Sequence, residues 1–339
     1  MLNYHNFTKE GEFTMLDITL DGGGTKLNGI LFDEDFNVVR RARSGGVNAT
    51  QNGKDAAEKS VSDCLDALIP SDVSEVGTVY ATFVGDCRVL TEVLGKRIKF
   101  SKLCLWGEDY SGLLAGAGYH TGLLALAGTG SDVFNVHKDK TSIVGGFGPI
   151  VGDQGGGEWI GIQAIRALGR DIAGWGEKTS LTNAIMEKYE TDGQIFRLID
   201  KLHSSSTPYA MAASLVPLVG KSAFAEDKVA LEILSNAGIA MAKQMLALLR
   251  IDPIIEHKTV VLCGGSWKSH PIMKKSFEDA LHAVYPELVV QRPWFEHVVA
   301  GMMEKALLLG YSRDEAHAML KEKCTEESLE EMNKRYECY

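Results

Sequence analysis

The stretch LDITLDGGGTKLNGILFD, residues 16–33, constrains the fold of this chain more than any other. It places one acid, Asp21, and three consecutive glycines between two apolar runs that both read as β-strands. A glycine backbone can approach a ligand closely, and its N–H groups can point at an anion. A β-hairpin with so bare a turn therefore predicts a phosphate-binding loop at a strand end.

Two common nucleotide-binding motifs are excluded by the spacing around these glycines. A dinucleotide fingerprint needs G-x-G-x-x-G at the start of a helix, whereas GGGTKLNGILF continues into a second strand. The P-loop pattern G-x-x-x-x-G-K-[ST] occurs nowhere in the chain. The hairpin instead suits a loop that wraps the β- and γ-phosphates of ATP, with Asp21 where Mg²⁺ and its waters bridge those phosphates.

Two further glycine turns follow apolar runs, AGTGSD from Ala127 and CGGSWKS from Cys263. One such turn is weak support, because strand ends often need glycine for steric reasons alone. Three turns of this composition, each after an expected strand, predict loops that contact one polyanionic ligand.

Size and charge limit the class of partner. A chain of 339 residues exceeds what one hydrophobic core usually serves, so we expect two domains. The net charge of −10 argues against a nucleic-acid partner, which needs a basic surface. No apolar run approaches the roughly 18 residues of a membrane span, and the N-terminal MLNYHNFTKEGEFTM lacks the features of a secretory signal. We expect a cytoplasmic protein with a small-molecule substrate and no membrane partner.

Short β runs and helices alternate along the chain, which predicts mixed or parallel sheets flanked by helices. The segment 203–210, HSSSTPYA, reads as a loop within the second domain. The six cysteines form no C-x-x-C pair and read as small buried hydrophobic residues rather than metal ligands. The expected strands lie at 16–20, 27–32, 37–44, 76–85, 102–108, 123–131 and 260–266, and the expected helices at 55–68, 158–168, 181–189, 195–203, 226–250 and 298–310.

The hairpin DGGGTK, the later GTGS and CGGSWKS resemble the two phosphate motifs and the adenosine motif of the sugar kinase, heat-shock chaperone and actin superfamily. Within it, GEDYSGLLAG, LALAGTGSD and GGFGPIVGDQGGGEWIG, in that order, resemble N-acetylglucosamine kinases, in the branch that includes the ATPase activators of benzoyl-CoA reductase. The resemblance implies an α/β fold of two ribonuclease-H-like (actin-like ATPase) domains, 16–122 and 123–310, with a central cleft. A helical tail, 311–339, would pack back on the N-terminal domain, and the protein would be a homodimer.

The resemblance also implies ligand contacts at individual positions. Asp109, at the start of the helix after KLCLWGE, would accept the proton of the sugar hydroxyl, with ATP and Mg²⁺ as cofactors and Asp21 serving the metal. Glu108 is the competing base, and a helix N-cap is the alternative role of Asp109. The implied nucleotide contacts are Gly23, Gly24, Thr25, Lys26, Gly128, Thr129, Gly130, Gly264, Gly265, Ser266 and Lys268. The implied amino-sugar contacts are Asn48, Asp109, Ser131, Asp132, Gly146, Phe147, Gly148 and Asp153.

Three positions depart from the vertebrate-type pattern of that family. Phe147 replaces a tryptophan, Gln154 a glutamate and Gly156 a serine. These changes remove an indole N–H and enlarge or neutralise the pocket. The resemblance therefore favours phosphorylation of N-acetylglucosamine to its 6-phosphate, with N-acetylmuramic acid or glucosamine as alternative substrates. An ATPase that activates a redox enzyme is the alternative of a different class. For that role Cys263 has no second cysteine in a matching turn.

Overall fold

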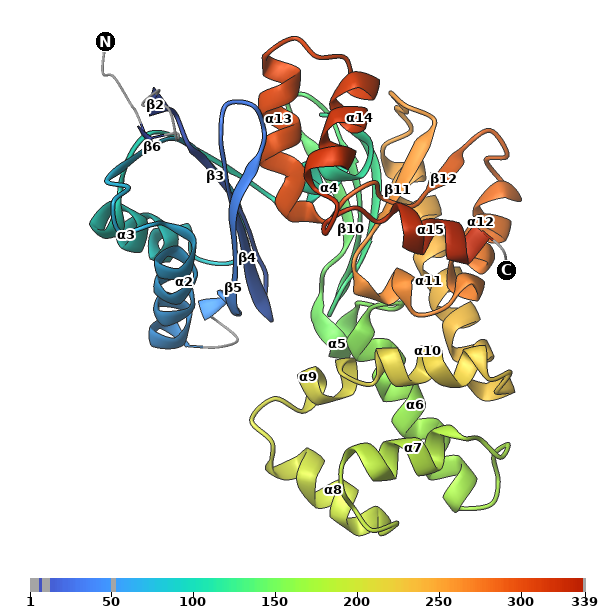
Figure 1. The fold of residues 1–339 in the computed structure, drawn as a ribbon. Coiled ribbons are helices and arrows are strands. Elements are labelled where there is room, and N and C mark those ends of the chain that lie inside the picture. Colours follow the sequence, from blue (N-terminus) through green and yellow to red (C-terminus); the bar gives the residue numbers. More distant parts are fainter. Residues whose placement is uncertain (1–5, 8–12, 50–52, 338–339) are drawn as a thin grey trace. The chain divides into compact units, whose positions relative to one another are not determined.

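The computed structural model describes residues 6–7, 13–49 and 53–337, which form two compact units (Figure 1). The first unit contains the described residues up to His120 and those from Pro293 to Met332. The second contains Thr121–Arg292 and the residues from Asn333 onward. The predicted lack of a secretory signal concerns residues 1–15, most of which lie outside the described part.

The first unit is built on a mixed five-stranded sheet with the order β5-β4-β3-β6-β7. The central strand β3 pairs antiparallel with β4, its hairpin partner, and parallel with β6. The strands are β3 (Asp17–Gly22), β4 (Lys26–Phe32), β5 (Val38–Gly45), β6 (Glu75–Phe83) and β7 (Lys99–Trp106), and a separate two-stranded sheet is formed by β1 (Asn6–Phe7) and β2 (Phe13–Thr14).

Helices cover both faces of this sheet because successive residues of its strands point to opposite sides. Leu31 joins a core with the helices α2 (Lys54–Leu68) and α3 (Cys87–Arg97). Its neighbours Ile30 and Phe32 join a second core on the other face. That second core includes residues of α4 (Glu108–Ala117), the 3₁₀ turn η2 (His297–Val299), α13 (Ala300–Leu308) and α14 (Arg313–Lys323).

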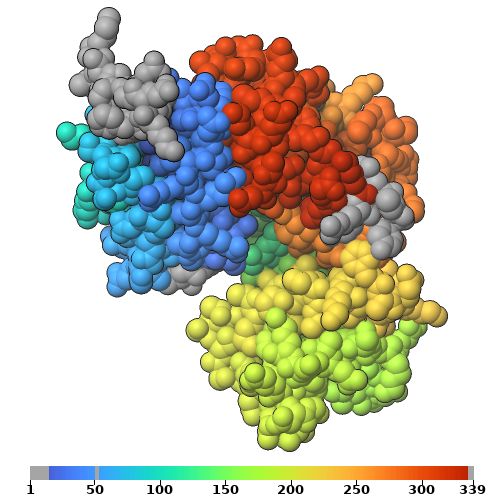
Figure 2. All heavy atoms as spheres, viewed as in Figure 1, coloured from blue at the N-terminus to red at the C-terminus, as the bar shows by residue number. Residues whose placement is uncertain are grey.

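The segment 293–310 differs from the expectation that placed it in the second domain. Val298, Met302 and Met303 are buried in the second core of the first unit, on the sheet face opposite α2 and α3. The segment therefore belongs to the first unit. The space-filling view shows this late part of the chain directly against the N-terminal strands (Figure 2). Its apolar residues need that sheet face as a partner, which sequence order alone does not reveal.

The second unit repeats the strand order with β10-β9-β8-β11-β12. The sequence did not predict β9, β10 or β12: β9 follows the glycine turn directly, β10 is largely exposed, and β12 has three residues. The strands are β8 (Gly122–Ala127), β9 (Ser131–Val136), β10 (Thr141–Gly145), β11 (Thr259–Cys263) and β12 (Val289–Gln291).

The long helix α11 packs across the second unit's core. Its apolar residues at three- and four-residue steps, among them Ile233, Ala237, Met241 and Leu248, are buried, and the Asp227 side chain caps its start by accepting a bond from the Ala230 N–H. The loop predicted at 203–210 is confined to residues 205–207. The helices are α5 (Gly148–Val151), α6 (Gly157–Ile172), α7 (Leu181–Lys188), α8 (Ile195–Ser204), α9 (Pro208–Ala213), α10 (Val216–Phe224), α11 (Lys228–Ile251), η1 (Gly265–Lys268) and α12 (Pro271–His282), followed at the end of the chain by α15 (Glu330–Glu337).

Candidate functional site

The glycine hairpin of the first unit lies at the carboxyl edge of its sheet. Gly22, at the end of β3, pairs with Phe83 at the end of β6. The turn is closed by the Gly23 N–H, which donates to the Lys26 carbonyl at 2.9 Å. The Val47 N–H donates to the Gly23 carbonyl, also at 2.9 Å, so the loop before Asn48 is held against the same turn.

The glycines of the predicted phosphate turns divide into two kinds. A side chain at Gly264 would collide with the backbone of Ala127 at a left-handed φ of 103°, and one at Gly22 or Gly130 would press on the side chain of Val47 or Asp153, so the fold itself favours glycine there. The positions Gly23, Gly128 and Gly265 have nothing within 4 Å of where a Cβ would stand, and their φ angles are not in the left-handed region. The fold does not require glycine at these open positions. Close approach of a ligand to the protein backbone supplies a reason for it.

Asp21 is the acid of the hairpin, and it lies opposite Asn28 on β4. Surrounding protein raises the pKa of its carboxyl, while His297, Lys26 and a hydrogen bond with Asn28 oppose that rise. Among the described residues, no group of three His, Cys, Asp or Glu side chains is placed to hold a metal ion by itself. One such carboxylate fits Mg²⁺, which usually binds through one or two carboxylates, waters and substrate phosphates.

Asp109 lies in the first turn of α4, directly after β7. The N-cap of α4 is Gly107 and carries no side-chain cap, so the capping role considered for Asp109 is wrong. Thr82 of β6 and Trp106 of β7 are paired neighbours, so the parallel strands β3, β6 and β7 bring the hairpin turn and Asp109 to one edge of the sheet. That edge is where open α/β sheets place ligands.

In the second unit the glycine turn after β8 is surrounded by two other glycine segments. The Gly157 and Glu158 N–H groups donate to the Gly128 and Thr129 carbonyls, each at 2.9 Å. The Ser266 hydroxyl donates to the Gly128 carbonyl at 3.1 Å. The predicted second phosphate turn and the predicted adenosine segment are thus one connected structure at the carboxyl edge of the sheet.

Asp153 anchors the predicted sugar-contact loop. It is 6% exposed with a left-handed φ of 59°, and it accepts a hydrogen bond from the Gly148 N–H at 3.1 Å. Burial raises its pKa, while backbone hydrogen bonds from Gly148, Phe147 and Ser131 oppose the rise. Its Oδ2 stands 2.3 Å from where a Cβ on Gly130 would be, so the acid touches the phosphate turn.

Asp132 lies beside it. Burial and then the Asp153 charge raise the pKa of Asp132 to about 6, and its Oδ1 is buried with no hydrogen-bond partner among the described residues. A buried carboxyl oxygen without a partner can accept a hydrogen bond from a hydroxyl or amine group of a ligand.

The remaining predicted sugar contacts of the second unit lie near these acids. Ser131 is buried, and its hydroxyl donates to the Gln154 carbonyl at 3.2 Å, so this bond stabilises the loop next to Asp153. Gly146 has a left-handed φ and meets the Asp132 carboxyl. Phe147 is 69% exposed at the start of α5, which leaves its ring available to an apolar group.

Sequence reasoning missed two polar residues of this region. Glu158 is buried in the first turn of α6, with a pKa raised by burial and then by Asp153. Its place after GGG, in the first turn of a helix, was a usable signal. Gln244 of α11 donates to the Gln154 carbonyl at 2.7 Å, and its Oε1 is buried without a partner among the described residues. Nothing local in the sequence links residue 244 to 154.

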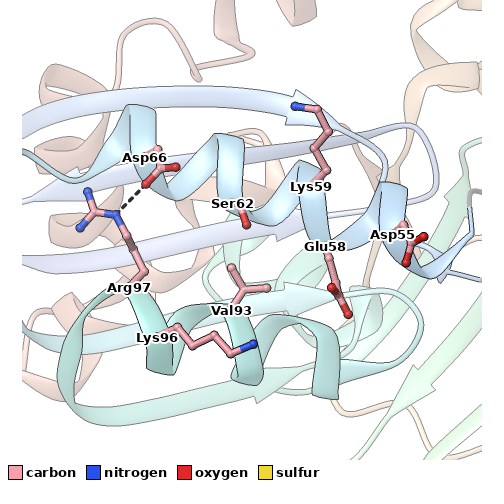
Figure 3. A pocket seen from close by; sticks show the side chains of 8 residues that line it. All are labelled: Asp55, Glu58, Lys59, Ser62, Asp66, Val93, Lys96 and Arg97. Atoms are coloured by element: carbon pink, nitrogen blue, oxygen red, sulfur yellow. Dashed lines mark hydrogen bonds and ion pairs between the residues drawn. The ribbon is translucent and has the colours of Figure 1, made fainter.

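A groove on the outer helices of the first unit holds none of the predicted site residues. Figure 3 shows it between α2 and α3, with the Arg97 Nε and the Asp66 Oδ1 2.7 Å apart. Acids and cations are mixed along it, so it offers no field of one sign to a charged ligand. It is lined by Asp55, Glu58, Lys59, Ser62, Asp66, Val93, Lys96 and Arg97.

Residues 18–298 match the model of a protein family described as the BadF/BadG/BcrA/BcrD ATPase family. The chain is 24% identical over 284 residues to the N-acetylmuramic acid/N-acetylglucosamine kinase of Clostridium acetobutylicum, covering 80% of this chain and 92% of that protein. It is 26% identical over 294 residues to the N-acetyl-D-glucosamine kinase of Dictyostelium discoideum, covering 79% and 91%.

The fold is also similar to a solved structure, a candidate N-acetylglucosamine kinase of Chromobacterium violaceum. The TM-score is 0.62 at 23% identity, covering 85% of this chain and 98% of the other. The predicted α/β fold with two ribonuclease-H-like sheets is confirmed by this similarity and by the repeated strand order. In the described part of the chain, no helix is both long and apolar enough to cross a membrane.

Proposed function

Because the chain belongs to the BadF/BadG/BcrA/BcrD ATPase family, we propose that it is a kinase. It transfers the γ-phosphoryl group of ATP to an amino sugar. One observation supports this most. Both predicted phosphate turns and the predicted adenosine segment contain a glycine with open space around it that the fold does not require, at Gly23, Gly128 and Gly265. The names of the two relatives support an amino sugar as the acceptor.

In this proposal the turn residues of both units bind the nucleotide. The phosphates are bound by N–H groups of the two hairpin turns, with Thr25, Lys26 and Thr129 adding donors. The segment Gly264–Lys268 borders the nucleoside, because Ser266 fixes it to the Gly128 carbonyl. Mg²⁺, when bound beside Asp21, neutralises charge on the β- and γ-phosphates.

Asp109 is the proposed general base. A sugar hydroxyl is a poor nucleophile, and a positioned carboxylate that takes its proton contributes about 10²–10⁴-fold to the rate. The hydroxyl oxygen forms a bond to the γ-phosphorus, the bond from that phosphorus to ADP breaks, and the proton passes to Asp109. The 6-hydroxyl of N-acetylglucosamine is the proposed acceptor.

The sugar is oriented, in the same proposal, by Asn48 from the first unit and by Asp132 and Asp153 from the second. Carboxylates and amides can pair with vicinal hydroxyls. Phe147 offers its exposed ring to the N-acetyl group, flanked by the backbone of Gly146 and Gly148. Three acids gather here, Asp132, Asp153 and Glu158, so a neutral sugar should be preferred over N-acetylmuramic acid, whose lactyl group carries a negative charge.

The test is release of ADP from Mg-ATP across a panel of glucose, glucosamine, N-acetylglucosamine, N-acetylmannosamine and N-acetylmuramic acid. We expect turnover with N-acetylglucosamine above turnover with N-acetylmuramic acid, and little ADP without sugar. Nucleotide binding without turnover of any sugar would contradict the proposal and favour an ATPase that activates a redox partner. A homodimer and a cytoplasmic location stay predictions, and sedimentation of the purified chain tests the first.

A further inference from the structure

One face of β3 carries a polar stripe that faces the late part of the chain. Asp17, Thr19 and Asp21 are spaced two residues apart, so they share one face of the strand. The Asp17 Oδ2 pairs with the Lys305 Nζ at 2.8 Å. The Thr19 hydroxyl donates to the Val298 carbonyl at 2.7 Å and accepts from the Gly301 N–H at 3.3 Å. The first two members of the stripe are thus satisfied by residues 298–305.

The third member, Asp21, lies on the strand against which the turn with His297 packs: η2 contacts both β3 and β4, the two strands of the glycine hairpin. Against the rise caused by burial, His297 is close enough to lower the pKa of the Asp21 carboxyl. The bond from Thr19 to the Val298 carbonyl fixes the backbone next to His297 against β3, the strand that carries Asp21. Both Lys26 and Asp21 belong to the predicted phosphate turn, which makes His297 a neighbour of that turn.

The imidazole of His297 is incompletely satisfied. Its Nε2 is buried, and within the described part of the chain it has no hydrogen-bond partner. Buried polar atoms in native proteins nearly always have a partner, and an unmade bond costs about 1–3 kcal/mol. Asp17 and Thr19 of the facing stripe have protein partners, so a bound ligand is the candidate for the missing partner of His297.

We propose that His297 is a further nucleotide-binding residue, whose Nε2–H donates a hydrogen bond to a terminal phosphate oxygen of the nucleotide bound at the glycine hairpin. The proposal rests on the proposed function for the identity of the ligand. It assigns to a residue more than 270 positions after Asp21 a place in the same phosphate site. His297 acts on binding and positioning, whereas Asp109 remains the proposed base.

The test compares two replacements that both remove the imidazole. His297→Gln keeps an amide N–H that can reach near the position of Nε2, and His297→Leu keeps volume but has no donor. Calorimetric titration with Mg-ADP, without sugar, measures binding directly. We expect His297→Leu to weaken Mg-ADP binding about 5–10-fold, as for one lost hydrogen bond, and His297→Gln to restore most of it.

His120→Gln is the matched control, because His120 is a half-exposed histidine of the same unit whose Nε2 pairs with Glu304 at 2.8 Å. It should lower the unfolding temperature and leave Mg-ADP binding unchanged. Equal weakening by His297→Leu and His297→Gln would overturn the hydrogen-bond role, and wild-type binding by His297→Leu would overturn the proposal altogether.

The titration separates this inference from the proposed function. A wild-type protein that binds Mg-ADP but phosphorylates no amino sugar would contradict the function and leave the His297 result valid. Amino-sugar turnover together with unchanged Mg-ADP binding by His297→Leu would contradict only the inference.

Discussion

The two units share a strand order but differ in how their glycine hairpins are surrounded. In the first unit no protein atom lies within 4 Å of where a Cβ on Gly23 would stand. The buried acid of β3, Asp17, is neutralised by Lys305. In the second the turn is enclosed by Asp153, Gly156 and the segment after β11, and Asp132 keeps an unsatisfied carboxyl oxygen. In the proposed function, one copy of this architecture carries metal and base chemistry and the other carries acceptor recognition.

The first prediction tests whether the general base lies in the first unit, by the loss of kcat in an Asp109 variant. Asp109→Asn should lower kcat with N-acetylglucosamine about 10²–10⁴-fold, because the amide cannot take the hydroxyl proton. Binding of Mg-ATP should stay within a few-fold of wild type, since Asp109 lies outside the glycine turn. Steady-state kinetics and calorimetry measure the two quantities.

Glu108→Gln is the matched control for Asp109, one residue earlier in the same helix turn. It should keep kcat within a few-fold. Near wild-type turnover by Asp109→Asn, or an equal loss of kcat in Asp132→Asn, would contradict the placing of the base in the first unit and of acceptor recognition in the second.

The second prediction concerns stability and contrasts two ion pairs. Lys305→Met leaves Asp17, which is 4% exposed, as a buried charge without its cation, and should cost about 3–5 kcal/mol of unfolding free energy. Lys178→Met in the second unit removes an 87% exposed lysine from Asp171, which keeps its bonds from Thr179 and Thr182. That change should cost less than about 1 kcal/mol. Urea unfolding measures both, and equal losses would contradict the contrast.

The third prediction uses the raised pKa of Asp132, about 6 in the folded protein against roughly 3.9 in the unfolded chain. A folded state that binds the proton more tightly loses stability as pH rises between these values. Asp132→Asn removes this loss and should stabilise the protein by about 1–3 kcal/mol at pH 8, with little gain at pH 4. Thermal unfolding at the two pH values measures the difference.

Asp171→Asn is the control of opposite sign. Lys178 and Thr182 lower the pKa of Asp171, so its stabilising contribution is present at neutral pH and is lost as pH falls through the lowered value. The amide should therefore destabilise at pH 7 and matter less in acid. A stabilised Asp171→Asn, or an Asp132→Asn that gains equally at pH 4 and pH 8, would contradict these assignments.

The smallest expected effect separates glycines required by ligand from glycines required by fold. Gly23→Ala and Gly128→Ala meet no protein atom within 4 Å and should leave the unfolding temperature nearly unchanged. Each should weaken Mg-ATP binding about tenfold, because the methyl group occupies the approach of a phosphate. Gly130→Ala would press on Asp153 and should destabilise the fold by about 1–3 kcal/mol. Loss of stability without loss of nucleotide binding at Gly23 would reverse this interpretation.

The sequence predicted the fold where its signals were local. The hairpin at Asp21 follows from glycine placement and the long helix α11 from apolar periodicity, whereas the helix after Trp106 was implied by the resemblance alone. The edge strand β10 was missed because its exposed residues carry no hydrophobic alternation. The duplicated strand order was implied only by the resemblance, because it is a property of strand pairing and the sequence shows no repeat of fixed period.

The candidate site was predictable in its motifs and unpredictable in its long-range partners. DGGGTK and GTGS identified the open positions Gly23 and Gly128. The apposition of Asp21 and His297 depends on the return of the chain after Pro293 to the first unit. Gln244 meets Gln154 through packing of α11, a contact between residues 90 positions apart. Neither relation leaves a periodic or compositional trace.

Transfer of the γ-phosphoryl group to the sugar can be followed with labelled ATP. The protein is incubated with γ-³²P-labelled ATP, Mg²⁺ and N-acetylglucosamine, and the labelled products are separated by chromatography. We expect the label in a sugar phosphate, and we expect Asp109→Asn to abolish this product. Label found in inorganic phosphate at the same rate with and without sugar would contradict this expectation.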